Sequence, residues 1–190
     1  MTSNQAPRII IIGGPPASGK STLAEWLARE FHLPLLSRDH FKETLMDTLG
    51  SPDTDRSHEL GAAAYAILAL MQQQLIDAGV GAVIESNFQR GISEKDLLPI
   101  VPRTRMVAIY CQIEKEVAKE RFVERAESGD RHPGHHDTKP EKVEELEESL
   151  DTGQYDPLEL GIPYLIVDST NGYKPDEHEI LQFIVDKTGV

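Results

Sequence analysis

Residues 8–21 read RIIIIGGPPASGKS and largely decide the fold of this chain. The stretch Ile9–Ile12 is apolar without interruption, which is typical of a strand buried on both faces of a parallel sheet. Gly14 begins a stretch that fits G-x-x-x-x-G-K-[ST], and apolar side chains then recur at helical spacing through residues 20–31. A buried strand, a glycine-rich loop and a helix in this order predict a phosphate-binding loop.

The residue types of this loop match the oxygens of a nucleotide phosphate. Glycines let backbone N–H groups curl around the phosphate, and the following helix adds the partial positive charge of its N-terminus. Lys20 is expected to reach the β- and γ-phosphates, and the Ser21 hydroxyl to ligate Mg²⁺. The predicted ATP-binding residues are Gly14, Ala17, Ser18, Gly19, Lys20, Ser21 and Thr22. The alternative is a glycine-rich turn that binds nothing.

Apolar runs and helical spacings alternate along the rest of the chain. Strands are predicted at residues 8–14, 33–37, 81–87, 106–112 and 164–167. Helices are predicted at residues 20–31, 39–49, 57–78, 114–128, 141–150 and 175–187. This alternation indicates an α/β fold with a mainly parallel sheet. The 190 residues are expected to form a single domain, 1–190, with a charged insertion over the sheet at about 114–151.

The composition argues against several classes of protein. The chain has 19 Lys and Arg against 32 Asp and Glu, and its net charge of −13 disfavours broad binding of nucleic acid or an anionic membrane. A small basic pocket is compatible with this charge. The single cysteine, Cys111, excludes an intramolecular disulfide and is expected in the core. No apolar run is long enough to span a bilayer and no signal-peptide pattern is present, so we expect a cytoplasmic protein.

An acidic residue follows the second predicted strand. Asp39 lies 19 positions beyond Lys20, and in a doubly wound sheet the carboxyl ends of the strands face one crevice. A carboxylate there could accept a proton from an acceptor hydroxyl, as in a kinase. Asp39 could equally be a helix N-cap, a position that Asp often fills. The usual base-reading motif of GTPases, N-K-x-D, is absent.

Four motifs in order resemble one group of kinases. They are the phosphate loop, the SRDHFK segment at 37–42, the ESN segment at 85–87, and the pair Arg121 and Arg125. The chain resembles a group of P-loop kinases. This group includes 5′-hydroxyl polynucleotide kinases, chloramphenicol phosphotransferase, zeta-toxin-like kinases and small bacterial AAA-type ATP-binding kinases. By motif, this resemblance covers residues 8 to about 131.

The resemblance implies a P-loop NTPase fold with a five-stranded parallel sheet in the order 2-3-1-4-5, flanked by helices and carrying a helical lid. It also implies that Asp39 is the general base. Arg38 and Lys42 are implied as contacts to the acceptor, and Lys42 stands where the family often has Arg. Asn87 is also assigned to the acceptor side of the site.

Two acids compete for the metal side of the site. Glu85 ends the third predicted strand and could hold a Mg²⁺-bound water, although the family usually has Asp there. Asp168 also ends an apolar strand, but the resemblance places the third strand beside the phosphate-loop strand. We therefore prefer Ser21 and Glu85 for the metal, and the alternative for Glu85 is a structural or solvated acid.

Arginines and histidines mark the predicted lid. Arg121 and Arg125 stand at i and i+4 on one helix face, where they could close on the phosphates or pair with neighbouring glutamates. Arg131 begins the segment RHPGHHD, which we interpret as a lid loop that faces the substrate rather than a zinc site, because it is a Pro-Gly turn. Arg121 is also assigned to binding of the ATP phosphates. Arg131 and His132 are assigned to the substrate side, and the choice among the histidines stays open.

Together these features predict an ATP- and Mg²⁺-dependent kinase that phosphorylates a hydroxyl of a small-molecule or nucleotide-like acceptor. Lys20, Asp39, Arg121 and Arg125 are its predicted catalytic residues. One alternative is a 5′-hydroxyl polynucleotide kinase, for which the net charge of −13 offers little backbone attraction. Another is a nucleotide-dependent binding or switch protein without an acceptor, which would not need Asp39. The acceptor and the oligomeric state are not predicted.

Overall fold

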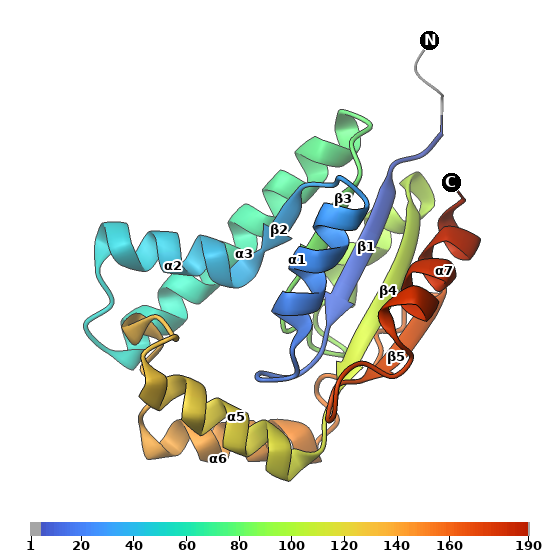
Figure 1. Cartoon of the computed structure of the whole chain (residues 1–190). Helices are drawn as coiled ribbons and strands as arrows, with labels where there is room; N and C mark the ends of the chain where they lie inside the picture. Colours follow the sequence, from blue (N-terminus) through green and yellow to red (C-terminus); the bar gives the residue numbers. More distant parts are fainter. Residues whose placement is uncertain (1–4, 190) are drawn as a thin grey trace.

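The computed structural model describes residues 5–189, which form one five-stranded sheet with helices on both faces (Figure 1). All strand pairs are parallel, and the order is β2-β3-β1-β4-β5. The predicted α/β class and strand order are therefore confirmed. The strands are β1 (Arg8–Gly13), β2 (Leu35–Ser37), β3 (Ala82–Glu85), β4 (Arg105–Gln112) and β5 (Tyr164–Asp168).

The predicted helices are present with small shifts of their ends. The bounds are α1 (Lys20–Glu30), α2 (Arg38–Leu49), α3 (Thr54–Asp77), α4 (Glu94–Leu97), α5 (Lys115–Ser128), α6 (Pro140–Asp151) and α7 (Glu177–Thr188). Helix α3 begins three residues before the prediction because the Asp53 side chain accepts a hydrogen bond from the Arg56 amide, 2.8 Å away, and caps it. The prediction missed α4 and two 3₁₀ helices, η1 (Leu98–Arg103) and η2 (Pro133–His135), which are too short to show a period.

The unbroken apolar run of β1 is explained by burial on both faces of the sheet. Ile9 and Ile11 pack in the layer that includes side chains of α3, and Ile10 and Ile12 pack against α1 and α7; all four isoleucines are fully buried. Cys111 of β4 is buried in the second layer, and burial raises the pKa of its thiol to about 12. It is a core residue, as predicted.

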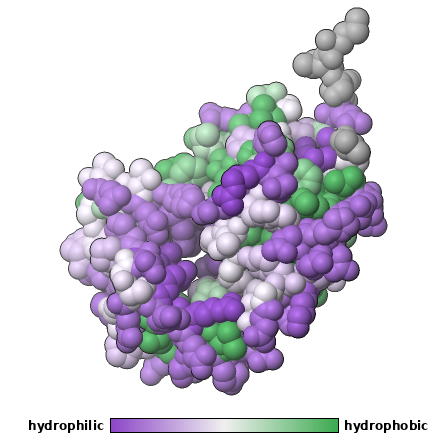
Figure 2. All heavy atoms as spheres, viewed as in Figure 1, coloured by the Kyte–Doolittle hydropathy of each residue, from purple (hydrophilic) through white to green (hydrophobic). Residues whose placement is uncertain are grey.

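The remaining helices surround one end of the sheet. Helix α2 lies beyond β2, α3 runs from there across one face of β2 and β3, and α5 and α6 lie across the end at which the strands finish (Figure 1). The surface is hollowed between these parts (Figure 2). Parallel strands bring their carboxyl ends to the same edge, so the loop after β1, the start of α2 directly after β2 and the segment after β3 all reach this hollow. Within residues 5–189, no helix has the length and apolar character needed to cross a membrane.

Candidate active site

The loop between β1 and α1 has a backbone that depends on glycine. Gly14 has a φ of +137°, and a Cβ atom there would lie 2.5 Å from the Cys111 carbonyl oxygen of β4. Ala17 and Gly19 also have positive φ values, 64° and 72°. The loop is thus wound tightly against the sheet before it enters α1.

Helix α1 begins without a side-chain cap, because its N-cap is Gly19. Its first amides and its positive dipole end therefore face the loop. The Ser18 hydroxyl is fully buried and has no hydrogen-bond partner among the described residues. An uncapped helix N-terminus, a tight glycine loop and an unsatisfied buried hydroxyl fit the phosphates of a nucleotide.

We expect Gly14→Ala to destabilise the protein by at least about 2 kcal/mol, because the new methyl group meets a backbone oxygen that cannot move freely. Gly79→Ala is the matched control, since Gly79 also has a positive φ, +71°, but has nothing within 4 Å of the added Cβ. The control should lose only about 1 kcal/mol. Urea unfolding of both variants checks the difference, and equal losses would contradict it.

A buried polar cluster follows the loop. The Lys20 Nζ donates to the Pro15 carbonyl oxygen at 3.1 Å and lies 4.0 Å from Glu85 Oε1. Glu85 is 2% exposed and accepts hydrogen bonds from the hydroxyls of Ser21, at 3.2 Å, and Ser37, at 2.7 Å. Burial lowers the pKa of Lys20, and the nearby Glu85 opposes that shift. Ser37, at the end of β2, was not predicted as part of the site.

The two acids that competed for the metal side lie far apart in the sheet. Glu85 ends β3, which pairs directly with β1, whereas Asp168 ends β5 at the outer edge. The Asp168 carboxylate accepts a hydrogen bond from the Thr170 amide at 2.8 Å and so shapes a turn. The structure therefore brings Glu85, and not Asp168, together with Lys20 and Ser21.

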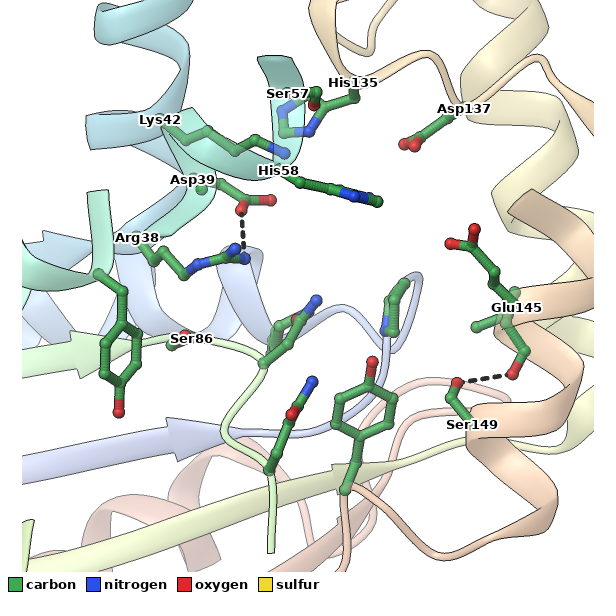
Figure 3. A pocket seen from close by; sticks show the side chains of 18 of the residues that line it. Arg38, Asp39, Lys42, Ser57, His58, Ser86, His135, Asp137, Glu145 and Ser149 are labelled. Atoms are coloured by element: carbon green, nitrogen blue, oxygen red, sulfur yellow. Dashed lines mark hydrogen bonds and ion pairs between the residues drawn. The ribbon is translucent and has the colours of Figure 1, made fainter. Parts of the chain in front are cut away.

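A cleft of about 640 Å³ connects the phosphate loop with α2, α3, α5 and α6 (Figure 3). In Figure 3, Arg38, Asp39 and Lys42 project from α2 toward this space, and Glu145 and Ser149 project from α6 on the other side. The predicted residues that line the cleft are Lys20, Ser21, Arg38, Asp39, Lys42, Asn87, Arg125 and Arg131. The predicted residue Thr22 is exposed on the first turn of α1 and does not line it.

Asp39 is not an N-cap. Helix α2 begins at Arg38 with Ser37 as its N-cap, so Asp39 stands in the first helical turn with its carboxylate in the cleft. Its oxygens lie 2.9 Å from Arg131 Nη1 and 3.7 Å from Arg38 Nη1. Burial alone would raise the pKa of Asp39, but the charge of Arg131, with those of Lys20 and Arg38, holds it well below its ordinary value. The carboxylate is therefore ionised and can accept a hydrogen bond from a hydroxyl, and it is a weak base as long as Arg131 contacts it.

Arg131 connects the loop after α5 to α2. Its guanidinium contacts Asp39, Asp137 at 3.0 Å and Glu43 at 3.4 Å. Its Nη2 lies 3.0 Å from His135 Nδ1, and His135 Nε2 lies 2.9 Å from Glu43 Oε1. An arginine has no acceptor, so His135 accepts at Nδ1 and donates to Glu43 from Nε2. Burial lowers the pKa of His135, which agrees with this neutral form.

Within the segment RHPGHHD, the histidine that lines the cleft is not the predicted one. His135 is 5% exposed and lines the cleft, whereas His132 lies outside it with its Nε2 3.1 Å from Asp47. The sequence pattern RHPGHH offered no signal to separate them, because the choice depends on how η2 turns against α2.

The two arginines of α5 have different surroundings. Arg125 lines the cleft, and its Nε is buried without a partner among the described residues. Burial, with the charge of Arg131, lowers the pKa of Arg125. Arg121 instead donates to the carbonyl oxygens of Ser169, at 3.0 Å, and Thr170, at 2.8 Å, and does not line the cleft. The structure thus brings Arg125 to the predicted phosphate side but not Arg121.

Comparisons with known proteins agree with this fold. Residues 9–150 match the family model of the AAA domain. No curated protein sequence matched the chain. A "putative kinase" from Chloroflexus aurantiacus is 34% identical over 96% of this chain and 99% of that one, with a TM-score of 0.86.

Two more distant structures share the fold alone. A sugar kinase from Janibacter sp. is 20% identical, with 94% of each chain covered and a TM-score of 0.61. A gluconokinase from Sinorhizobium meliloti is 17% identical over 97% of this chain and 95% of that one, with a TM-score of 0.60. Since the family model spans most of the sequence, this chain belongs to the AAA domain family and has the P-loop fold of the kinases it resembles.

Proposed function

We propose that this protein is an ATP-dependent kinase that transfers the γ-phosphoryl group to a hydroxyl of a small-molecule or nucleotide-like acceptor. The observation that carries the proposal is that Lys20, Asp39 and Arg125 line one cleft, although they come from α1, α2 and α5. A cation on the phosphate side and a carboxylate on the acceptor side are the parts that phosphoryl transfer requires. The similarity to kinases supports this reading.

The residues that line the cleft would have the following roles in the reaction. The amides of residues 17–21 and the Nζ of Lys20 bind and orient the phosphates. Arg125 lines the cleft and would bring a permanent positive charge to the transferring group. The Ser21 hydroxyl and the Glu85 carboxylate, 3.2 Å apart, would hold Mg²⁺. When bound, this ion neutralises charge between the β- and γ-phosphates.

Asp39 would orient the acceptor hydroxyl and accept its proton. Because Arg131 now contacts Asp39 at 2.9 Å, the hydroxyl would enter beside or in place of that contact. We also propose that the segment at about 114–151, which contains α5, η2 and α6, acts as the lid of a single kinase domain. A cleft of about 640 Å³ fits a small acceptor.

We expect Arg125→Met to lower turnover by about 10²-fold, since it removes one donor to the developing charge. Arg121→Met is the matched control on the same helix, and it should lower turnover by less than tenfold because Arg121 contacts backbone oxygens outside the cleft. Steady-state rates at saturating ATP measure both. A larger loss in Arg121→Met would show that the two arginines have been assigned the wrong way round.

The proposal is tested by ADP formation with Mg·ATP against a panel of acceptors. The panel contains nucleosides, 5′-hydroxyl oligonucleotides, hydroxylated antibiotics, sugars and nucleotide-sugars, and mass spectrometry detects the phosphorylated product. Stimulation by one small acceptor supports the proposal. Stimulation only by oligonucleotides, with a steep salt dependence, would favour a polynucleotide kinase. Slow ATP hydrolysis that no acceptor stimulates would favour a switch protein.

A further inference from the structure

The segment between β5 and α7, residues 169–176, contacts the phosphate loop where that loop enters α1. It begins at the carboxyl end of β5 and therefore lies at the same end of the sheet as the phosphate loop (Figure 1). The Tyr173 hydroxyl donates a hydrogen bond to the Gly19 carbonyl oxygen at 3.0 Å. A Cβ atom at position 19 would lie 3.5 Å from the same hydroxyl oxygen, so Tyr173 packs directly over this part of the loop.

The carbonyl that Tyr173 holds belongs to the peptide unit that carries the first amide of α1. Gly19 is the N-cap of α1, and its carbonyl oxygen also accepts a hydrogen bond from the Leu23 amide at 3.1 Å. In a planar trans peptide, the Gly19 carbonyl oxygen and the Lys20 N–H point in opposite directions. The two hydrogen bonds that hold this oxygen therefore also hold the Lys20 N–H toward the loop, where it can meet a phosphate.

Gly19 needs this restraint more than another residue would. Its φ of 72° lies in the left-handed region, and glycine moves between its allowed backbone regions at little cost. No side chain caps this end of α1, so the fixing of the Gly19 peptide falls to its neighbours. Burial raises the pKa of Tyr173 to about 12, so its hydroxyl keeps the proton that it donates.

The segment that carries Tyr173 is itself fixed to β4 and to α5. The amide and the hydroxyl of Ser169 both donate to the Gln112 carbonyl oxygen at the end of β4, each at 2.8 Å. Arg121 of α5 donates to the carbonyl oxygens of Ser169, at 3.0 Å, and Thr170, at 2.8 Å. Within residues 5–189, Arg121 forms no ion pair with a carboxylate. Its guanidinium therefore serves to join α5 to residues 169–176.

We propose that Tyr173 is a positioning residue of the phosphate loop. Its hydroxyl holds the Gly19 peptide so that the Lys20 N–H points at the bound phosphates, and Arg121 holds the segment that carries Tyr173. This inference rests on the proposed function for nucleotide binding at the loop, but not for transfer to an acceptor. It gives Arg121 a role other than the predicted one, because Arg121 acts on ATP through residues 169–176 and not by contact with a phosphate.

The test measures binding by calorimetry, with ATP and tripolyphosphate as probes, both as their magnesium complexes. Tripolyphosphate has the three phosphates without the nucleoside, so it reports on the phosphate loop alone. Tyr173→Phe removes only the hydroxyl and keeps the ring, which packs against the core. We expect both probes to bind about 3- to 10-fold more weakly, the effect of one lost hydrogen bond. Tyr164→Phe is the matched control, because Tyr164 is 51% exposed at the other end of β5, and it should change neither affinity.

Further readouts separate positioning from a structural role. Tyr173→Phe should melt close to the wild-type temperature, because the packing of its ring is kept. In steady-state ATP turnover, KM should rise by the same factor as the dissociation constant while kcat stays nearly unchanged, since the lost contact binds ground state and transition state alike. Arg121→Met should weaken both probes no more than Tyr173→Phe does, and the double variant should lose no more than Tyr173→Phe alone. Losses that add would show that Arg121 contacts a phosphate itself, against the role proposed for it.

Failure of this inference is distinct from failure of the proposed function. If an acceptor is phosphorylated but Tyr173→Phe binds both probes as tightly as the wild type, the kinase function stands and the positioning role is wrong. Weaker binding of ATP alone, with unchanged binding of tripolyphosphate, would show that Tyr173 contacts the nucleoside and would also overturn the inference. If no acceptor is phosphorylated but both probes bind in a Tyr173-dependent way, the positioning role stands and the kinase function is wrong.

Discussion

Lys20→Met is expected to lower ATP-dependent phosphoryl transfer by about 10³-fold, because in the proposed function it removes the cation that binds the transferring group. Lys20 is 7% exposed, and its Nζ is fixed by the Pro15 carbonyl oxygen and by Glu85. The charge is therefore held in place before the nucleotide arrives. A charge that is already in position lowers the activation barrier more than a mobile charge would, because no group has to be reoriented during the reaction.

The measurement is single-turnover phosphoryl transfer at saturating nucleotide, so that weaker binding is separated from slower chemistry. Lys187→Met is the control, since Lys187 is exposed on the last turn of α7, and it should leave the rate unchanged. Because Lys20→Met removes the cation beside the buried Glu85, its melting temperature must be compared with that of the wild type. A stable Lys20→Met protein that transfers phosphate at the wild-type rate would contradict the assignment.

The sequence predicted the phosphate loop correctly because its pattern is local. A buried strand, the glycine spacing and the helix that follows are all set within residues 8–31, and the parallel sheet then brings the ends of β2 and β3 to the same edge. This is why the side-by-side placement of Lys20 and Glu85 could be predicted from strand order, which came from the resemblance to a kinase group.

The lid side could not be predicted in the same detail. Arg121 and Arg125 are equivalent in sequence spacing, but only the packing of α5 decides that one meets Ser169 and the other the cleft. The inward position of His135 likewise depends on the turn of η2, and its contact with Glu43 joins residues that are 92 positions apart. Long-range side-chain contacts of this kind leave no periodic signal in the sequence.

Asp39→Asn is expected to lower the turnover number by about 10²- to 10⁴-fold, the range that a positioned proton acceptor contributes. The substitution keeps the size of the side chain but removes its charge. The pKa of Asp39 lies below its ordinary value, so the wild-type carboxylate stays ionised between neutral pH and about pH 5. The wild-type rate should therefore show no loss from protonation of Asp39 in that range.

Asp47→Asn is the matched control for this substitution. Asp47 lies on the same helix, is exposed outside the cleft and pairs with His132 at 3.1 Å, so its loss should change the rate by less than twofold. The two readouts of Asp39→Asn separate its possible roles. A group that acts on the hydroxyl of a bound acceptor should lower acceptor-stimulated transfer much more than the slow hydrolysis of ATP that occurs without an acceptor.

If Asp39 only holds Arg131, the variant should instead behave like Arg131→Met, and the double variant should lose no more than either single one. If Asp39 acts on the acceptor hydroxyl, Asp39→Asn should lose much more than Arg131→Met and should do so at saturating acceptor. An unchanged rate in Asp39→Asn would remove the carboxylate from the mechanism. The cleft would then match a nucleotide-dependent binding protein better than a kinase, because only the phosphate side would have a function.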